Sequence, residues 1–246
     1  MDVLGVGISA TSLPAAVATV AGWIERKERR YVCVTGVHGV MESQEDPELM
    51  AIHNQSGLTV PDGAPMVWAG RAAGATGMGR VRGPDLMVAL CRLAATQGWT
   101  SYFYGGAPDT PHLLADRLRS RFPGLEVVGC MSPPFRPLTE QENSDFVGQI
   151  NAAGPDLVWV GLSTPKQERW MAENIDRLEA SALLGVGAAF DIHAGLVPEP
   201  PRWIQSSGFE WLYRLSRDPG RLWKRYARHN PRFVARMVRQ QPFLRP

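Results

Sequence analysis

The sequence predicts an α/β protein with a Rossmann-like, three-layer arrangement, in which helices cover both faces of a mainly parallel sheet. Two observations lead to this fold class. Short runs rich in β-branched and aromatic residues alternate along the chain with longer segments of helical character. Strands joined through helices form right-handed crossovers, which make neighbouring strands parallel. Ligands bind beyond the carboxyl ends of such strands, so we expect functional residues there.

Six short segments are predicted to form buried strands, because β-branched, aromatic and other apolar residues dominate them. They are "YVCVTG" (31–36), "LTVPDG" (58–63), "TSYFYGG" (100–106), "LEVVGCM" (125–131), "LVWVGLS" (157–163) and "ALLGVGAAF" (182–190). Helices are expected between them. Asp46 and Asp109 each precede a proline, and Thr139 stands three residues before Glu142, so these residues are predicted to cap helix starts. Gly154, like Gly57, suits a helix end.

The charge is divided unevenly along the chain. Of 26 Lys and Arg and 24 Asp and Glu residues, 11 and 2 lie in 202–246, so this segment carries +9 and the rest −7. A tail this basic favours an anionic partner such as phospholipid, a diphosphate or nucleic acid. The Pro-rich stretch "GLVPEPPRW" marks a joint before it. We therefore predict an α/β domain over 1–200 and a basic, aromatic, helical appendage over 201–246.

Several classes of protein lack support in the sequence. Cys33, Cys91 and Cys130 are scattered and form no C-x-x-C, which argues against a disulfide framework and a zinc site and favours a reducing cytoplasm. No secretory leader and no run of about 18 apolar residues is visible. No G-x-x-x-x-G-K-[ST], H-E-x-x-H, G-x-S-x-G or D-x-D motif occurs. Isolated histidines, His38 and His193, lack metal-ligand spacing, so we expect no metal and no cofactor.

The N-terminal glycines imitate a dinucleotide-binding fingerprint. Gly5-x-Gly7-x-x-Ala10 fits the spacing, and Glu25 lies about 20 residues further on, as in a nicotinamide-dependent oxidoreductase. However, the preceding strand has room only for residues 1–4, and the Ser-Leu-Pro that follows interrupts the helix that should begin at the glycines. An oxidoreductase therefore stays an alternative, as does a nucleic-acid-binding protein acting through the basic tail.

Two predicted strand ends carry candidate functional residues. Asp62 follows a strand directly, and Gly63 allows a sharp turn, so Asp62 suits either a general base or a turn or cap aspartate. Thr164 and Gln167 fit a capping box at a helix start. Alternatively, free amides at this start, together with Lys166, bind a diphosphate. Both interpretations remain open for both strand ends.

A third strand end repeats the pattern. Gly185 and Gly187 permit the close approach of a ligand or of packed backbone, and Asp191 follows them.

Six motifs, taken together and in order, resemble the WecG/TagA/CpsF family of bacterial glycosyltransferases. They are "TGVHGVMESQEDPEL", "VPDGAPMVW", "RVRGPDLM", "VGLSTPKQERW", "GVGAAFDIHAG" and "GFEWLYRLSRDPGRLWKRY", and they span almost the whole chain. The resemblance implies an inverting, metal-independent transfer of a sugar, often N-acetylmannosamine or a related acid. The implied donor is a UDP-sugar, and the implied acceptor is a sugar linked to polyprenyl diphosphate. Members build teichoic acids, common antigen, capsules or exopolysaccharides.

The resemblance also implies roles for particular residues. Asp62 corresponds to the base, Gln167 to a donor-binding residue, Arg80 to a residue near the diphosphate, and Asp191 to a contact of the nucleoside; Lys166 lies next to Gln167. The sequence departs from the family pattern at the second strand end, where Thr35 is followed by Gly-Val-His instead of a nearby Asn. The donor role of Thr35 is therefore open, with His38 as its replacement.

The basic tail is expected to serve the acceptor and the membrane. Arg214, Arg221 and Arg225 fall in the matching tail motif and are candidates for binding the acceptor's diphosphate. Apolar stripes beside cations predict docking to an anionic membrane, which places the protein on the inner face of the bacterial cell membrane. We expect no nucleic-acid partner. The sequence leaves the oligomeric state open, a homo-oligomer included.

Overall fold

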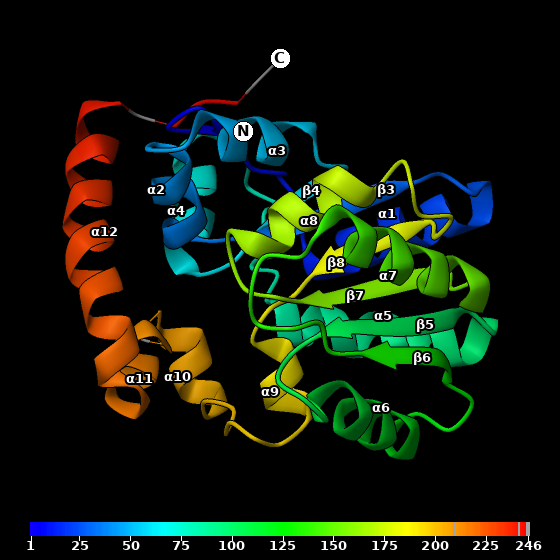
Figure 1. The fold of residues 1–246 in the computed structure, drawn as a ribbon. Helices are drawn as coiled ribbons and strands as arrows, with labels where there is room; N and C mark the ends of the chain where they lie inside the picture. The colour runs from blue at the N-terminus through cyan, green and yellow to red at the C-terminus, as the bar shows by residue number, and fades with distance from the viewer. Residues whose placement is uncertain (209, 241, 245–246) are drawn as a thin grey trace.

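A computed structural model describes residues 1–208, 210–240 and 242–244, without the side chains of residues 206, 221 and 225. Its centre is a six-stranded, all-parallel sheet of order β4-β3-β8-β7-β5-β6 (Figure 1). The strands are β3 (Arg30–Thr35), β4 (Leu58–Pro61), β5 (Thr100–Gly105), β6 (Glu126–Met131), β7 (Leu157–Gly161) and β8 (Ala182–Gly185). The predicted fold class is confirmed, and each strand falls within its predicted segment or starts one residue before it.

Helices connect the strands and continue into the tail. In the main body they are α1 (Leu13–Arg26), α2 (Val37–Ser43), α3 (Pro47–Gln55), α4 (Ala64–Ala72), α5 (Gly83–Gln97), α6 (Thr110–Arg121), α7 (Glu140–Ala153), α8 (Lys166–Asn174) and α9 (Ala189–His193). The C-terminal part holds α10 (Arg202–Ser207), α11 (Glu210–Arg217) and α12 (Pro219–Arg239).

The two faces of the sheet are buried by different helices. Side chains alternate along the central strands, so that Phe103 and Trp159 pack with residues of α1, α5, α6 and α9. Their neighbours Tyr104 and Val158 face the other way and pack with residues of α7 and α8. This double burial explains why the central strands are almost continuously apolar in the sequence.

Most predicted helix signals hold. Asp46 accepts a hydrogen bond from the amide of Leu49, Thr139 and Glu142 form a capping box, and Gly154 ends α7 in the left-handed conformation. Asp109 occupies the predicted cap position of α6, but its side chain makes no capping hydrogen bond there.

The N-terminal glycines belong to a hairpin that the sequence did not predict. The short strands β1 (Asp2–Val3) and β2 (Val6–Gly7) pair antiparallel, and Gly5 lies in the turn between them with φ 85°. A dinucleotide fingerprint needs a parallel strand followed directly by a helix. Since α1 starts only at Leu13, this segment does not have the geometry of a nicotinamide site, and the oxidoreductase interpretation loses its support.

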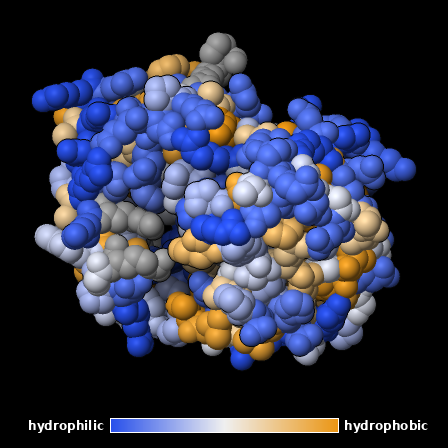
Figure 2. Space-filling view, in the orientation of Figure 1, coloured by the Kyte–Doolittle hydropathy of each residue, from blue (hydrophilic) through white to orange (hydrophobic). Residues whose placement is uncertain are grey.

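The C-terminal segment returns across the body of the protein to the N-terminal hairpin. In Figure 1, α12 stands along the side of the molecule next to α2, and it runs toward the end of the molecule where the N-terminus lies. Phe233 of α12 packs into a cluster with residues of the hairpin and of α2, and Phe243 forms a bridge with Asp2. Hydrophilic residues dominate this side of the surface (Figure 2). Within the described residues, no helix is long and apolar enough to cross a membrane.

Candidate active site

Asp62 directly follows β4 at the carboxyl edge of the sheet, next to the end of β3. Its backbone amide donates a hydrogen bond of 2.9 Å to the carbonyl oxygen of Thr35. The polypeptide turns sharply here, because Gly63 adopts φ 86° before α4 begins. Gly36 faces the same turn, and a Cβ atom added to it would lie 2.8 Å from the carbonyl oxygen of Asp62. Two glycines therefore let this carboxylate sit close to the end of β3.

The surroundings of Asp62 favour a proton-accepting role. Burial raises the pKa of this carboxyl group, the nearby Glu210 adds to the rise, and Arg214, Arg80 and Arg82 oppose it. A raised pKa makes the carboxylate a stronger base. Gly63 is the cap residue of α4, so Asp62 does not occupy the cap position of that helix.

A cluster of arginines lies beside Asp62 and joins the appendage to the body. Arg80 donates hydrogen bonds to the backbone carbonyl of Gln205, at 2.6 Å, and to Glu210. Arg82 is buried, and its Nη1 donates to Glu199 at 2.9 Å and to the side chain of Gln205 at 2.7 Å. These residues come from the loop before α5 and from the segment around α10 and α11.

Arg214 completes this cluster from α11. Its Nε and Nη2 both donate to Glu210, at 3.0 and 2.6 Å. The side chain is the charge that most lowers the pKa of Asp62, so the two groups lie close together. The structure therefore brings together Asp62, Arg80 and Arg214, three residues that the sequence singled out. Two further members, Arg82 and Glu210, were missed, although both stand inside the motifs that carried the family resemblance.

A surface pocket borders the arginine cluster. Its volume is about 380 Å³, and it lies between α4, the loop before α5 and α10. Its lining includes Trp68, Arg80, Arg82 and Arg202. A concave, cationic surface next to a candidate base suits a phosphorylated ligand.

Gln167 lies at the second candidate position, at the start of α8 beyond β7. Its side chain is buried, and its Nε2 donates to Glu168 Oε1 at 3.0 Å. Gly185 and Gly187 lie against it, and a Cβ atom on either would come within 3.3 Å of its amide group. Gly185 and Gly187 thus make room for the side chain of Gln167. Of the two interpretations of these glycines, this contact supports packing within the protein.

The capping interpretation of this stretch was wrong. Pro165, and not Thr164, is the cap residue of α8, and it makes no side-chain capping hydrogen bond. Thr164 donates instead to the side chain of Glu168, at 2.9 Å. The backbone amide of Gln167 is also not free for a diphosphate, because it donates to the carbonyl oxygen of Ser163 at 3.0 Å.

Buried polar atoms gather at this edge of the sheet. Glu168 is fully buried, and burial raises its pKa, while Gln167 and Thr164 donate to one of its oxygens. Thr35 Oγ1 and Gln167 Oε1 have no hydrogen-bond partner within the described part of the chain. Since β8 alone separates β3 from β7 in the sheet, Thr35 and Gln167 flank the same strand end. Burying a polar atom without a hydrogen bond costs free energy. These two atoms are therefore candidates for hydrogen bonds to a ligand.

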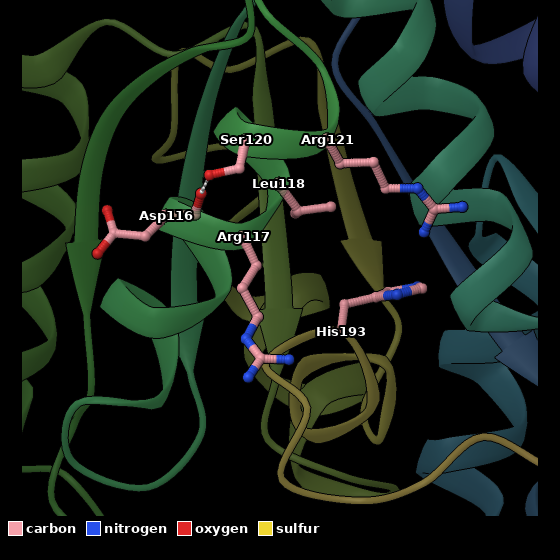
Figure 3. Close-up of a pocket in the computed structure, with 6 residues that line it drawn as sticks. All are labelled: Asp116, Arg117, Leu118, Ser120, Arg121 and His193. Carbon is pink, nitrogen blue, oxygen red and sulfur yellow. Dashed lines mark hydrogen bonds between the residues drawn. The ribbon is translucent and has the colours of Figure 1, made fainter.

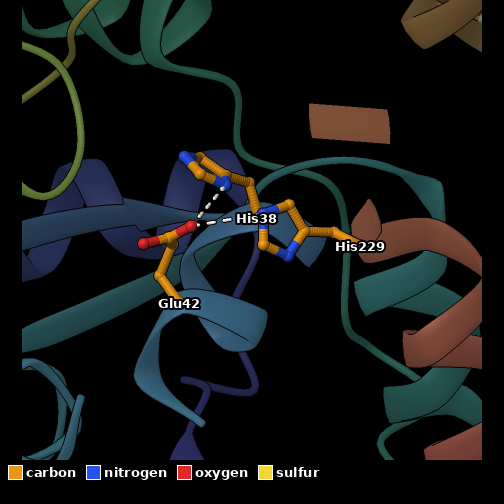
Figure 4. A group of neighbouring side chains, drawn as sticks. All are labelled: His38, Glu42 and His229. Carbon is orange, nitrogen blue, oxygen red and sulfur yellow. Dashed lines mark ion pairs between the residues drawn. The ribbon is translucent and has the colours of Figure 1, made fainter. Parts of the chain in front are cut away.

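His38 lies next to the appendage, with its ring 5.2 Å from the ring of His229. It forms a group with Glu42, one helical turn later in α2, and with His229 of α12 (Figure 4). The carboxylate of Glu42 lies 3.8 Å from Nδ1 of His38 and 3.2 Å from Nε2 of His229. The sequence predicted no metal site at His38 and did not single out His229. The group nevertheless has the nitrogen and oxygen atoms that bind a divalent ion.

The other predicted site residues lie at the same edge or outside the described residues. Lys166 is exposed at the first position of α8, and its Nζ lies 4.7 Å above the ring of Phe135, which is 95% exposed. Asp191 lies in α9, after the glycines that follow β8. The side chains of Arg221 and Arg225 are outside the described residues.

A second pocket, of about 430 Å³, lies between α6 and α9 (Figure 3). Arg117, Arg121 and His193 point toward it, and none of the residues around Asp62 lines it. Burial lowers the pKa of His193, which contacts the carbonyl oxygen of Pro84 at 2.9 Å. The edge that carries Asp62 is the better candidate site, because a carboxylate with a raised pKa and several arginines meet there.

Comparison with known proteins identifies the family of the chain. The family model "Glycosyl transferase WecG/TagA/CpsF family" matches residues 1–245. A protein of Bacillus spizizenii, named N-acetylglucosaminyldiphosphoundecaprenol N-acetyl-beta-D-mannosaminyltransferase, is 24% identical over 219 residues, which cover 89% of this chain and 82% of that protein. The resemblance noted in the sequence is thereby confirmed: the chain belongs to the WecG/TagA/CpsF family and is a glycosyltransferase.

Proposed function

We propose that this enzyme transfers N-acetylmannosamine, or a closely related sugar, from a UDP donor to a sugar linked to polyprenyl diphosphate, with inversion at the anomeric carbon. The product would serve the synthesis of a cell-surface polysaccharide or a teichoic acid. The relative from Bacillus spizizenii supports this choice, since its name gives a mannosaminyl transfer and an undecaprenyl diphosphate acceptor. One observation carries the proposal: a half-buried carboxylate, Asp62, lies among Arg80, Arg82 and Arg214.

In this mechanism Asp62 accepts the proton of the attacking acceptor hydroxyl group. The acceptor oxygen forms a bond to the anomeric carbon, while the bond from this carbon to the oxygen of the UDP β-phosphate breaks on the opposite face. The proton ends on Asp62, and the electron pair leaves with UDP. The raised pKa of Asp62 fits a group that must accept a proton near neutral pH.

Two groups of residues would bind the two substrates. Gln167, Thr35, Lys166 and Asp191 lie at or just beyond the ends of β3, β7 and β8 and are assigned to the donor. Arg80 and Arg214 are assigned to diphosphate, because guanidinium groups bind phosphate oxygens in pairs and stabilise negative charge that grows in the transition state. The sequence has no D-x-D motif to hold a metal ion, so cations of the protein take over this charge.

The appendage is proposed to bind the membrane that carries the lipid acceptor. Trp203 and Trp223 are 72% and 60% exposed, on α10 and α12, the two helices that contact α11. Tryptophan favours the membrane interface, and nearby Lys and Arg residues favour an anionic leaflet. The enzyme would thus work as a peripheral protein at the cytoplasmic face of the membrane.

The test is a direct transfer assay. The protein is incubated with a set of UDP-sugars and a short-chain lipid-diphosphate-GlcNAc analogue, and the products are weighed by mass spectrometry. We expect one N-acetylhexosamine mass to be added, most with UDP-N-acetylmannosamine, and NMR of the product to show the inverted anomer. Absence of transfer from every UDP-sugar, or retention of the donor configuration, would contradict the proposal.

A further inference from the structure

Glu210, the first residue of α11, has its carboxylate enclosed by three guanidinium groups. Its Oε1 accepts both hydrogen bonds of Arg214, and its Oε2 accepts one from Arg80 and lies 3.2 Å from Nε of Arg82. The residue is only 8% exposed. Two of these arginines precede α5, and the third is on α11, so one carboxylate joins segments about 130 positions apart.

The negative charge of Glu210 stabilises the cluster of three arginines. Three guanidinium groups repel one another when they are brought together in a partly buried place. A carboxylate between them attracts all three and offsets this repulsion. Burial raises the pKa of Glu210, but Arg214, Arg82 and Arg80 together outweigh it and leave the pKa below its usual value. Glu210 is therefore ionised at neutral pH.

No other described contact of the cluster reaches all three arginines. The carbonyl oxygen of Gln205 binds Arg80, and the side chains of Gln205 and Glu199 bind Arg82. None of these groups contacts Arg214, which is the arginine that most lowers the pKa of Asp62.

We infer that Glu210 is a positioning residue of the transferase: it holds Arg80, Arg82 and Arg214 beside Asp62 in the arrangement that receives the diphosphate. This inference rests on the proposed function. Glu210 exchanges no proton with the substrates, and it acts only through the three guanidinium groups that it orders. A diphosphate arriving at the cluster then meets cations that are already in place, which lowers the cost of reorganisation in the transition state.

A role in docking the appendage alone would predict a different result. Glu45 provides the matched control, because it also joins the C-terminal segment to the body, through Arg228 and Arg232 of α12. It lies on the outer surface and touches none of the arginines near Asp62. Glu45→Gln therefore removes one docking carboxylate and leaves the cluster unchanged.

The experiment compares Glu210→Gln with Glu45→Gln in the full-length protein. For Glu210→Gln we expect kcat for transfer to the lipid acceptor to fall about 10²-fold, the scale of a misplaced catalytic cation. The KM for the UDP-sugar should change little, and Glu45→Gln should stay within about threefold of the wild type. In a background of Arg214→Ala, Glu210→Gln should cost little more, because its main partner is already gone.

Three outcomes would overturn the inference. They are wild-type kcat in Glu210→Gln, equal losses in both variants, and a Glu210→Gln loss that is undiminished in the Arg214→Ala background. An inactive wild-type protein would instead refute the proposed function itself. If Glu210→Gln does not fold, as circular dichroism would show, Glu210→Asp keeps the charge with a shorter reach. It should fold and retain more than a tenth of kcat, whereas a folded Glu210→Asp with no activity above that of Arg214→Ala would contradict positioning through charge.

Discussion

The amide nitrogen of Asp62 lies 2.9 Å from the carbonyl oxygen of Thr35, and this hydrogen bond extends the pairing of β3 and β4 by one residue. The candidate base is therefore fixed to the rigid sheet by its own backbone. The cap position of α4 belongs to Gly63 and not to Asp62. Substitutions at position 62 should for this reason change the chemistry with little effect on the fold.

Asp62→Asn should reduce kcat by about 10²-fold or more, because the amide cannot accept the proton. The free energy of unfolding at neutral pH should not fall. A carboxyl group whose pKa is raised by folding is less stable when ionised, so a neutral residue of the same shape is tolerated at least as well. Kinetics and thermal melts of the two proteins check both statements. Near-normal turnover would remove Asp62 from the mechanism.

The pH profile of the wild-type enzyme gives an independent check. Since the pKa of Asp62 is raised, kcat/KM should decline with falling pH at values above the usual range of aspartate, about 4. In Asp62→Asn this acidic limb should disappear from the residual activity. A limb that persists in the variant belongs to another group.

Gly36→Ala should displace the base without removing it. The added Cβ atom would lie 2.8 Å from the carbonyl oxygen of Asp62, so the turn must shift, at a cost of about 1–3 kcal/mol in stability and a reduced kcat. Gly148→Ala in α7 is the control, because a Cβ atom there has nothing within 4 Å. It should leave kcat unchanged and stabilise the helix by about 0.5–1 kcal/mol. Equal kcat in the two variants would contradict this assignment.

Gln167→Ala should weaken use of the UDP-sugar more than it weakens the fold. We expect kcat/KM for the donor to fall by more than the equivalent of about 1 kcal/mol. Asn143→Ala serves as the control, since it breaks another buried contact of α8, with Trp170 and Asn174, and does not involve Gln167. A loss of melting temperature in both variants with unchanged donor kinetics would assign Gln167 to packing alone.

Transfer should survive EDTA, because the chain lacks a D-x-D motif and has arginines beside the base. The group of His38, Glu42 and His229 makes the test sharper, since it has the donor atoms for an ion. Elemental analysis of the wild-type protein and of His229→Ala should find no stoichiometric metal in either. Loss of activity with EDTA that Mg²⁺ or Mn²⁺ restores would reverse this prediction.

Trp203→Ser together with Trp223→Ser should abolish binding to vesicles that contain anionic lipid. Both side chains are mostly exposed, so the fold should remain intact, and transfer to a short, water-soluble acceptor should persist. Truncation after Pro200 is a harsher test, because it also removes Glu210 from the arginine cluster and Phe233 from its apolar cluster. Vesicle binding by the double variant at the wild-type level would contradict a membrane role for these helices.

The sequence predicted the body of the fold better than the details of the site. Buried parallel strands have a recognisable apolar composition, so all six strands of the sheet were predicted. The β1–β2 hairpin has only two residues per strand and shows no such signal. Asp62 and Gln167 were located because they follow strands. The partnership of Arg82 with Glu210 depends on how the tail folds back over the body, and no local pattern encodes contacts of that range.

The contacts between α12 and the residues just after α2 complicate the effect of salt on membrane binding by this enzyme. Arg228 and Arg232 already bind Glu45, and Arg236 binds Gln44. Added salt would weaken these internal contacts together with any contact to lipid phosphate. A salt titration of vesicle binding would thus combine two processes, release from the bilayer and loosening of the helix. Repeating it with Glu45→Gln would separate them, because only the second process depends on that carboxylate.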